Sequence, residues 1–387
     1  MPYSAVFIIC EFDPFHFGHK FLIDEAKKVS GGAPVICIMS GNFTQRGECA
    51  ITDKFSRAES AVLCGADLVL SLPVFYSSAC AELFAAGAVK IIREISCGDE
   101  CALVFGSESG NINKLIKCAD NLDTEKFKNK IENVGANEQF AKSREEIYGE
   151  LFGDPSLISA PNNILGIEYI RAIKKYAPNI VPHTVKREGA MHNSSKTEHI
   201  YASATYLRKI ADTAEFYNFI PEITHGIYKN DKFPAKIQNA EKLILAKLRQ
   251  TEKFDFADGG GGLLQRIVKA SQNAQGYDEL ICAASTKRYT NARIRRCLLS
   301  AFLEITEEEQ HKDPTFTQLL ASNSAGLRFL SETKKRHRNI DIITKPSRHT
   351  DSTDFKREID ADNMFAFMMP SIAPFNYSLK KTPFILK

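Results

Sequence analysis

A glycine flanked by two histidines lies near the N-terminus, in the segment Glu11-Phe12-Asp13-Pro14-Phe15-His16-Phe17-Gly18-His19. This segment follows a short apolar run, 6–10, that is typical of a strand buried on both faces. In open α/β sheets ligands bind where a strand ends and a helix begins, and a helix N-terminus attracts anions. Imidazoles placed there can donate to phosphate oxygens and stabilise the charge that builds up as pyrophosphate leaves. We interpret the motif as an ATP site that directs chemistry at the α-phosphate; the alternative is two surface caps of a helix.

A second candidate patch is Ser203-Ala204-Thr205-Tyr206-Leu207-Arg208, where hydroxyl groups lie at an expected helix start and an arginine follows within two turns. Such a helix start can hold the β- and γ-phosphates while Arg208 supplies positive charge. The alternative is an ordinary serine N-cap with a solvated arginine. Other phosphate-binding loops are absent from the sequence, because no Gly-x-Gly-x-x-Gly follows the first apolar run and no Gly-Lys-Ser/Thr occurs.

The elements that would position these motifs alternate between strands and helices. Continuous apolar runs typical of buried strands occupy 6–10, 34–39, 68–70, 102–105 and 180–185. Helical patterns occupy 20–29, 54–64, 79–92 and 164–176, together with a charged stretch at 111–150. This alternation predicts an α/β fold with a Rossmann-like, doubly wound parallel sheet.

The pattern changes after about residue 215, where apolar strand runs almost vanish. Amphipathic stretches occupy 235–248, 263–272 and 292–303, and four consecutive glycines, 259–262, interrupt them. We therefore predict an ATP-binding catalytic domain over 1–214 and a mainly helical domain over 215–387.

Composition excludes several classes of protein. The chain has 387 residues, of which 44% are hydrophobic and 25% charged, as in ordinary globular proteins. No apolar run approaches the roughly 20 residues that cross a bilayer, and the first residues lack the basic start of a secretion signal. Ten cysteines occur without any Cys-x-x-Cys, which favours reduced core thiols over metal ligands. We expect a cytoplasmic protein with no metal held by its own side chains and no membrane partner.

The two phosphate-binding motifs together resemble the His-Ile-Gly-His superfamily of nucleotidyltransferases and class I synthetases. Further segments narrow this to the bacterial tRNA(Met) cytidine acetate ligase family, which the chain resembles over nearly its whole length. These segments are 11–19, 39–48, 105–108, 161–166, 184–187, 203–205 and 286–290. The resemblance implies ATP-dependent activation of acetate to acetyl-adenylate, with Mg²⁺, and acetyl transfer to N4 of the wobble cytidine of elongator tRNA(Met).

The resemblance also implies which residues form the site. His16, His19 and Arg208 would be catalytic. The ATP-binding residues would be Ile9, Cys10, Glu11, Phe12, Asp13, Pro14, Phe15, His16, Phe17, Gly18, His19, Lys20, Phe21, Leu22, Gly106, Asn162, Asn163, Arg187, Ser203 and Thr205. Asp13 departs from the family, which more often has Asn there, so its role stays open between binding magnesium and shaping the turn. For acetate, the candidate pocket is the turn 40–43, with a plain strand-to-helix turn as the alternative.

Basic residues are concentrated in the second half, where 281–348 holds 13 Lys or Arg against 7 Asp or Glu. One cluster comprises Lys287, Arg288, Tyr289, Arg293, Arg295 and Arg296, and a second comprises Lys334, Lys335, Arg336 and Arg338. Phosphate contacts supply most nucleic-acid affinity, and an aromatic ring can stack on an unpaired base. We predict that the first cluster binds tRNA rather than DNA; the alternative is a solvated helix face.

Two rival functions stay open from the sequence. One is a nucleotidyltransferase that joins ATP to a phosphorylated small molecule, which would need no basic helical domain. The other is a non-catalytic RNA-binding protein with a relic ATP pocket, against which the intact His16, Gly18, His19 and Arg208 argue.

Overall fold

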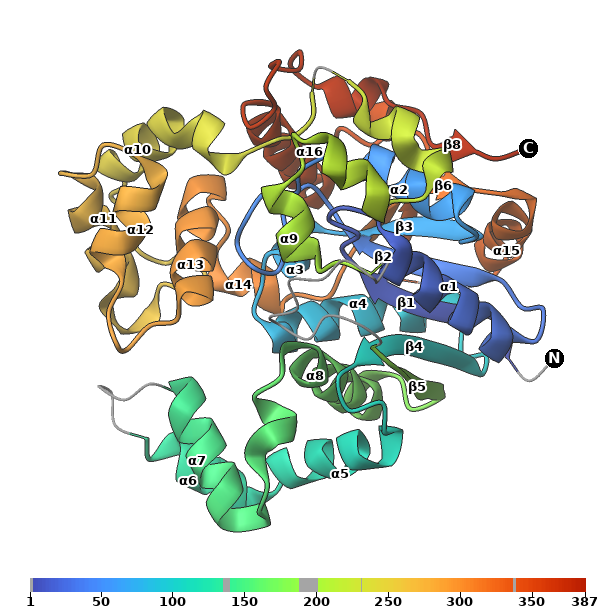
Figure 1. Ribbon diagram of the computed structural model, residues 1–387, viewed down its shortest axis with the longest axis horizontal. Helices are drawn as coiled ribbons and strands as arrows, with labels where there is room; N and C mark the ends of the chain where they lie inside the picture. Colours follow the sequence, from blue (N-terminus) through green and yellow to red (C-terminus); the bar gives the residue numbers. More distant parts are fainter. Residues whose placement is uncertain (1–2, 135–139, 188–200, 231, 337–338) are drawn as a thin grey trace.

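A computed structural model describes residues 3–134, 140–187, 201–230, 232–336 and 339–387. Its centre is an eight-stranded sheet with the order β5-β4-β1-β2-β3-β6-β7, to which β8 adds by pairing with β6 (Figure 1). The strands are β1 (Val6–Cys10), β2 (Val35–Ser40), β3 (Leu68–Leu72), β4 (Cys101–Ser107), β5 (Ile180–Lys186), β6 (Phe316–Ser322), β7 (Asp341–Ile343) and β8 (Phe384–Ile385). Strands β1 to β5 are mutually parallel, so their carboxyl ends meet at one edge.

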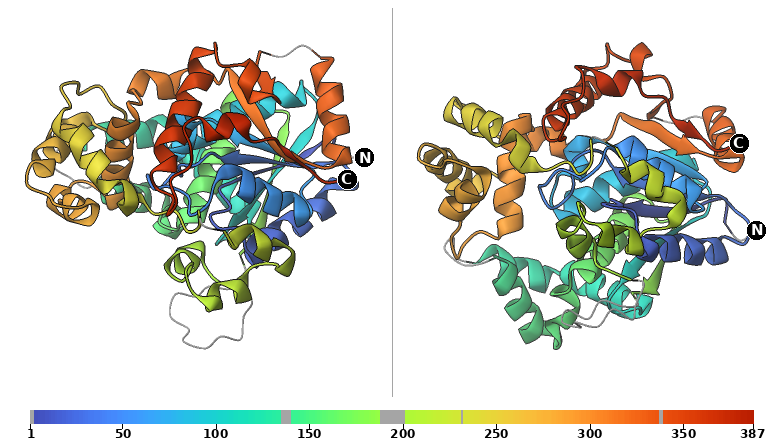
Figure 2. Two further views of the ribbon diagram at one scale, coloured as in Figure 1. Left: turned by 90° about the horizontal axis from the view of Figure 1, so that it is seen from above. Right: turned by 45° about the horizontal axis from the view of Figure 1, so that its top comes forward.

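Helices cover both faces of this sheet (Figure 2). The helices of the first half are α1 (Phe17–Ser30), α2 (Lys54–Leu63), α3 (Val74–Ser77), α4 (Ala81–Ser96), α5 (Ile112–Leu122), α6 (Glu125–Glu132), α7 (Phe140–Phe152), α8 (Pro161–Tyr176) and α9 (Ala204–Lys209). Strand side chains point to alternate faces. Accordingly Val6 and Ile8 pack with side chains of α1 and α2, whereas Phe7 and Ile9 pack with those of α4 and α8.

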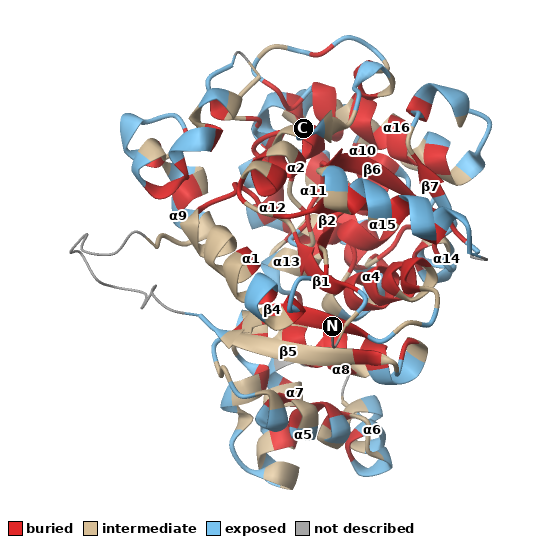
Figure 3. Ribbon diagram, turned by 90° about the vertical axis from the view of Figure 1, so that its right-hand side faces the viewer, coloured by how far each residue is buried: buried red, intermediate tan, exposed pale blue. Residues whose placement is uncertain are grey.

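The second half contributes helices and three strands. Its helices are α10 (Glu241–Arg249), α11 (Leu263–Ser271), α12 (Tyr277–Ala284), α13 (Asn291–Leu303), α14 (Glu307–His311), α15 (Ser324–Lys334) and α16 (Thr353–Ala366). Helices α10 to α13 gather beside the sheet, at the left of Figure 1, and α5 to α7 project below it. In Figure 3 the inner strands are buried, while β5 at the edge is only partly covered.

The predicted fold class is confirmed, because a mostly parallel sheet with flanking helices precedes a mainly helical group. One expectation differs: strand β6 comes after residue 215 and pairs antiparallel with β3. Polar residues interrupt its apolar pattern, yet they are buried and bonded, since Thr317 Oγ1 donates to the Ser71 carbonyl and Ser71 Oγ accepts from the Gln318 amide. The second half therefore completes the sheet of the first, and the boundary at 214/215 stays a prediction.

Buried ion pairs fasten α16 to the nucleotide-binding half. Lys54 is fully buried, and its Nζ lies 2.9 Å from both Glu358 Oε1 and Asp362 Oδ2. Asn42 Nδ2 donates to Asp362 Oδ1 over 2.7 Å, and Glu358 Oε2 accepts from the Val74 amide. Removing one partner of such a buried pair strongly destabilises the folded protein, because the other charge is left buried and uncompensated. The C-terminal helix is thus tied to the turn after β2.

Candidate active site

The histidine motif lies at the N-terminus of α1, directly beyond β1. His16 is the N-cap residue, and its Nδ1 accepts a hydrogen bond from the Gly18 amide over 3.0 Å. A Cβ atom at position 18 would lie 2.8 Å from His16 Cε1, so only glycine lets this cap form without displacing the ring. The His16 and His19 rings stack with centroids 3.8 Å apart. The two imidazoles therefore form one pre-arranged pair.

Both imidazoles are held in the neutral form. Burial, together with the charges of Arg187 and Arg208, lowers the pKa of His16 to about 3. Burial, His16 and Arg187 likewise lower the pKa of His19 well below its usual value. Because Nδ1 of His16 accepts from Gly18, its proton resides on Nε2, which can donate to a phosphate oxygen. Positive charge for phosphates must then come from the arginines.

His19 is supported from behind by aromatic rings. Phe12 and Phe15 are buried, with ring centroids 4.9 Å and 5.8 Å from that of His19. A hydrogen bond between the His19 ring and the Pro14 backbone opposes the lowering of its pKa, so the ring is held by its own loop as well as by the two phenylalanines.

The second patch contacts the first through Asp13 and Arg208. Arg208 Nη1 donates to the Asp13 carbonyl over 2.9 Å and lies 3.6 Å from Asp13 Oδ2. Asp13 Oδ1 accepts from the Ile51 amide over 2.7 Å. These bonds engage both carboxylate oxygens of Asp13 and favour the turn-shaping role over magnesium binding. Ser203 caps α9, accepting from the Tyr206 amide, as the ordinary-cap alternative requires; its contact with phosphate stays a prediction.

The expected residues after β4 and at the start of α8 also come together. Arg187 Nη1 lies 3.4 Å from Asn162 Oδ1, and a Cβ atom on Gly106 would lie 3.3 Å from Arg187 Cγ. Glu108, which sequence analysis did not select as a site residue, accepts from the amides of Asn162 and Asn163 and from Asn162 Nδ2. A carboxylate at a helix N-terminus stabilises it. Its place shortly after the apolar run 102–105, where a parallel strand ends, was the available signal.

The turn 40–43, expected as an acetate pocket, is committed to internal bonds. Asn42 is buried, and its amide group contacts Asp362, Tyr377 and the Lys54 amide. Arg57, fully buried and missed by sequence analysis, donates to the carbonyls of Ser40 and Gly41. These bonds favour the alternative interpretation, in which 40–43 is a plain strand-to-helix turn and does not bind acetate. The sequence signal that could have revealed Arg57 was a lone arginine on the buried face of an amphipathic helix.

The predicted tRNA-binding segment lies around the start of α13, and two of its members face inward. Arg296 is buried, and its guanidinium bonds both carboxylate oxygens of Asp258. Tyr289 is buried as well, with the guanidinium groups of Arg288 and Arg293 5.1 and 5.4 Å from its ring centroid. These surroundings disfavour phosphate contact by Arg296 and base stacking by Tyr289, and their tRNA-binding role stays a prediction. Burial and internal partners occupy both groups.

The other cations of this segment have different surroundings. Arg295 Nη1 lies 2.7 Å from Glu48 Oε1, in the loop after β2. Lys287 is exposed, and Arg288 is partly exposed. The second basic cluster lies elsewhere, because Arg336 bonds Asp99, directly before β4 and thus at the amino edge of the parallel strands. Arg338 lies outside the described residues.

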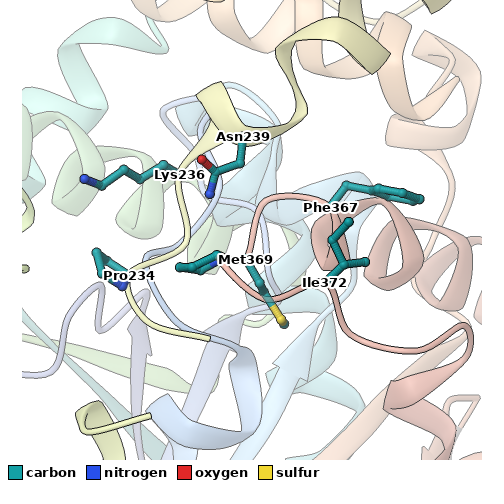
Figure 4. Close-up of a pocket in the computed structure, with 7 residues that line it drawn as sticks. Pro234, Lys236, Asn239, Phe367, Met369 and Ile372 are labelled. Carbon is teal, nitrogen blue, oxygen red and sulfur yellow. The ribbon is translucent and has the colours of Figure 1, made fainter. Parts of the chain in front are cut away.

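A pocket of about 450 Å³ lies away from the histidine motif, between the segments 234–239 and 367–372 (Figure 4). None of the residues lining it belongs to the expected site. Within the described ranges, no group of three or more His, Cys, Asp or Glu side chains is placed to hold a metal. Nor is any described helix long and apolar enough to span a membrane.

Comparison with known proteins now places this geometry in a family. The family model described as HIGH Nucleotidyl Transferase matches residues 3–378. The chain belongs to this family.

Similar proteins within the HIGH nucleotidyl transferase family share a more specific name. A protein of Caldanaerobacter subterraneus subsp. tengcongensis named tRNA(Met) cytidine acetate ligase is 37% identical, over 98% of each chain. One of the same name from Acetivibrio thermocellus is 32% identical over 92% of each. The crystal structure of Thermotoga maritima TmcAL bound with alpha-thio ATP matches with a TM-score of 0.87 and 27% identity, covering 99% of both chains. The family expected from the sequence motifs is confirmed.

Proposed function

We propose that this chain is an ATP-dependent tRNA(Met) cytidine acetate ligase of the cytoplasm. It activates acetate as acetyl-adenylate, releases pyrophosphate, and transfers the acetyl group to N4 of the wobble cytidine of elongator tRNA(Met), releasing AMP. The observation that carries the proposal is the stacked His16–His19 pair at the N-terminus of α1, with Arg187 and Arg208 close enough to act on it electrostatically. The relatives' names and the ATP analogue in the Thermotoga protein support it.

The site suits attack on an α-phosphate. Phosphoryl chemistry depends on in-line alignment and charge neutralisation more than on covalent help from the protein. We assign His16 Nε2–H and His19 as neutral donors to phosphate oxygens, and Arg187 and Arg208 as the balancing charges. Asn162 and Asn163 at the start of α8, with Gly106, would border the nucleotide. Mg²⁺ commonly binds through substrate phosphates, so we propose that it enters with ATP and offsets phosphate charge.

For the tRNA we propose contacts by Lys287 and Arg288, in the loop before α13, and by Arg293, in its first turn. Arg293 is half-buried and braces the glycine loop through the Asp258 and Gly260 carbonyls, which leaves Lys287 the most accessible of the three. Arg295 lies between this surface and the loop after β2. Phosphate contacts of this kind fix register and supply salt-dependent affinity.

One incubation tests the proposal against its rivals. Purified protein receives ATP, Mg²⁺, labelled acetate and unmodified elongator tRNA(Met), and nucleosides are analysed by mass. We expect labelled N4-acetylcytidine that requires both ATP and acetate. A dinucleotide-type product formed from a phosphorylated small molecule would instead support a cofactor-synthesis enzyme. Tight tRNA binding without ATP turnover would support an RNA-binding protein.

A further inference from the structure

Glu11 is fixed by one carboxylate oxygen and leaves the other available. It lies at the carboxyl end of β1, immediately before Phe12, which supports His19. Glu11 Oε1 accepts from the Gln45 amide over 2.8 Å and from Ser40 Oγ over 3.5 Å. Its Oε2 accepts no hydrogen bond from the described residues. The side chain is thus positioned beside the motif with one oxygen uncommitted.

The surroundings of Glu11 strengthen it as a proton acceptor. Burial raises the pKa of its carboxyl, and Asp13 acts in the same direction, while the Gln45 amide, Arg208 and Arg46 oppose them. A base whose pKa moves from the usual value toward neutrality is more effective near pH 7. Arg46 is exposed at the tip of the loop after β2. The carboxylate therefore sits between the nucleotide motif and a loop that contacts α13.

Acetyl transfer to an exocyclic amine needs a proton acceptor, and the neighbouring groups are already engaged. His16 Nδ1 is occupied by Gly18, and both oxygens of Asp13 face a donor, the Ile51 amide or Arg208. His19 is a weak base, since its pKa is lowered. Glu11 is the remaining group of the motif with a free basic atom.

We propose that Glu11 is the general base of the acetyl-transfer step, an inference that rests on the proposed function. The N4 lone pair attacks the acetyl carbon of acetyl-adenylate and a C–N bond forms. The bond between that carbon and the phosphate oxygen then breaks, and its electron pair leaves with AMP. The proton lost by N4 passes to Glu11 Oε2 and from there to water.

The two half-reactions make this role measurable. Acetate is already an anion, so its attack on ATP requires no proton acceptor, whereas amine attack does. Glu11→Gln keeps an oxygen for the Gln45 amide but cannot take up a proton. Acetate-dependent pyrophosphate exchange measures the first step, and single-turnover transfer from preformed acetyl-adenylate to tRNA measures the second.

We expect Glu11→Gln to slow transfer by on the order of 10²- to 10⁴-fold, and by at least about tenfold more than it slows exchange. The wild-type transfer rate should rise with pH to a plateau, and the variant should lose this rise. Glu11→Asp should restore part of the transfer rate. Other ionisable groups also face Glu11, and the pH dependence of transfer must be distinguished from theirs. These groups are Asp13, Arg208, Arg46, Tyr169 and Cys10.

The matched control is Glu100→Gln, an exposed carboxylate before β4 at the amino edge of the sheet, which should leave both steps unchanged. Transfer within threefold of wild type in Glu11→Gln, or equal losses in exchange and transfer, would overturn the role of Glu11. Failure of the wild-type protein to form N4-acetylcytidine would instead overturn the proposed function itself.

Discussion

The imidazoles of His16 and His19 stack with ring centroids 3.8 Å apart and planes inclined by 28°. Neither ring is charged in the free protein, because burial and nearby arginines lower both pKa values. On the proposed function we therefore expect the two rings to donate to the α-phosphate from fixed positions, and two cations, Arg187 and Arg208, to supply the charge. A fixed neutral donor loses no hydration shell when ATP enters, which is what electrostatic preorganisation requires.

Removing His19 should abolish activation without unfolding the protein. In His19→Ala we expect acetate-dependent exchange of pyrophosphate into ATP to fall by on the order of 10²- to 10³-fold, since one transition-state donor is lost. Circular dichroism should match wild type. His311→Ala, which changes an exposed histidine on α14, is the control and should retain full exchange. Exchange within a few-fold of wild type in His19→Ala would disprove the nucleotide-site assignment.

The neutral His16 should make the protein sensitive to acid. Below pH 6.5 the unfolded chain binds a proton at this position, whereas the folded chain does not until about pH 3. The free energy of unfolding therefore falls as pH drops through this window, by up to about 1.4 kcal/mol per pH unit from this residue. His16→Asn keeps an N-cap acceptor but has no titrating ring.

Urea unfolding at pH 7.0, 6.0 and 5.0 measures this effect. The wild-type protein should lose more stability than His16→Asn as pH falls, so the gap between the two curves changes with pH. A gap that stays constant from pH 7.0 to 5.0 would show that His16 titrates normally in the folded chain.

Charge reversal at the start of α13 should separate tRNA binding from folding. Lys287→Glu should weaken tRNA binding and reduce the slope of log affinity against log salt by roughly one unit, while exchange persists. Arg296→Glu should instead destabilise the fold by roughly 3–5 kcal/mol, because it replaces a buried guanidinium with a second carboxylate against the partly buried Asp258. Filter binding at several salt concentrations and thermal unfolding measure the two effects.

Lys334→Glu provides the control for Lys287, because this exposed residue lies on α15, next to the amino edge of the sheet. It should leave tRNA affinity within about twofold of wild type, as expected for a charge that makes no phosphate contact. Equal weakening by both reversals would point to a diffuse electrostatic effect and not to a surface around α13.

Lys54 should be essential for holding α16 in place. Lys54→Met leaves Glu358 and Asp362 buried without their cation, which should lower stability by about 3–5 kcal/mol. Burial already raises the pKa of Asp362 to about 6 with the lysine present. Without it, the folded-state pKa of Asp362 should rise further above its unfolded value, so the deficit should be larger at pH 8 than at pH 5.5. Denaturant titrations at both pH values test this, and a pH-independent deficit would contradict it.

The parallel part of the fold could be predicted because its strands are buried on both faces and read as unbroken apolar runs. Val6–Cys10 in β1 is the clearest example. Strand β6 could not be predicted in this way, since its polar residues Thr317 and Gln318 are stabilised by Ser71, some 246 residues away in the sequence. A local pattern carries no trace of such a partner.

In the site, too, features set by local sequence could be predicted, whereas those that depend on distant partners could not. The histidine motif follows from local spacing, and its contact with Ser203–Arg208 was expected from the family resemblance. Counting charges along 287–296 could not reveal that Arg296 is buried, because its partner Asp258 comes from a loop before α11. Arginine and tyrosine carry apolar surface as well as polar groups, so their type alone does not place them inside or outside.

The acyl donor should be free acetate activated by ATP, and not acetyl-coenzyme A. The N4 amine of cytidine is a weak nucleophile, and unactivated acetate cannot acylate it, whereas a mixed anhydride with AMP can. The described site has donors and cations grouped at the start of α1, as ATP and departing pyrophosphate require.

The sequence has no segment well suited to bind the pyrophosphate of coenzyme A. The closest segment, Gln45-Arg46-Gly47-Glu48, ends in a carboxylate that is paired with Arg295. Its Gly47 packs against the backbone of α13, where an added Cβ would lie 2.4 Å from the Arg296 nitrogen, so this glycine serves close packing. We therefore expect N4-acetylcytidine from ATP, Mg²⁺, acetate and elongator tRNA(Met), with AMP and pyrophosphate released in equal amounts. Efficient modification by acetyl-coenzyme A in the complete absence of ATP would overturn this mechanism, because it would leave the histidine motif without a reaction to catalyse.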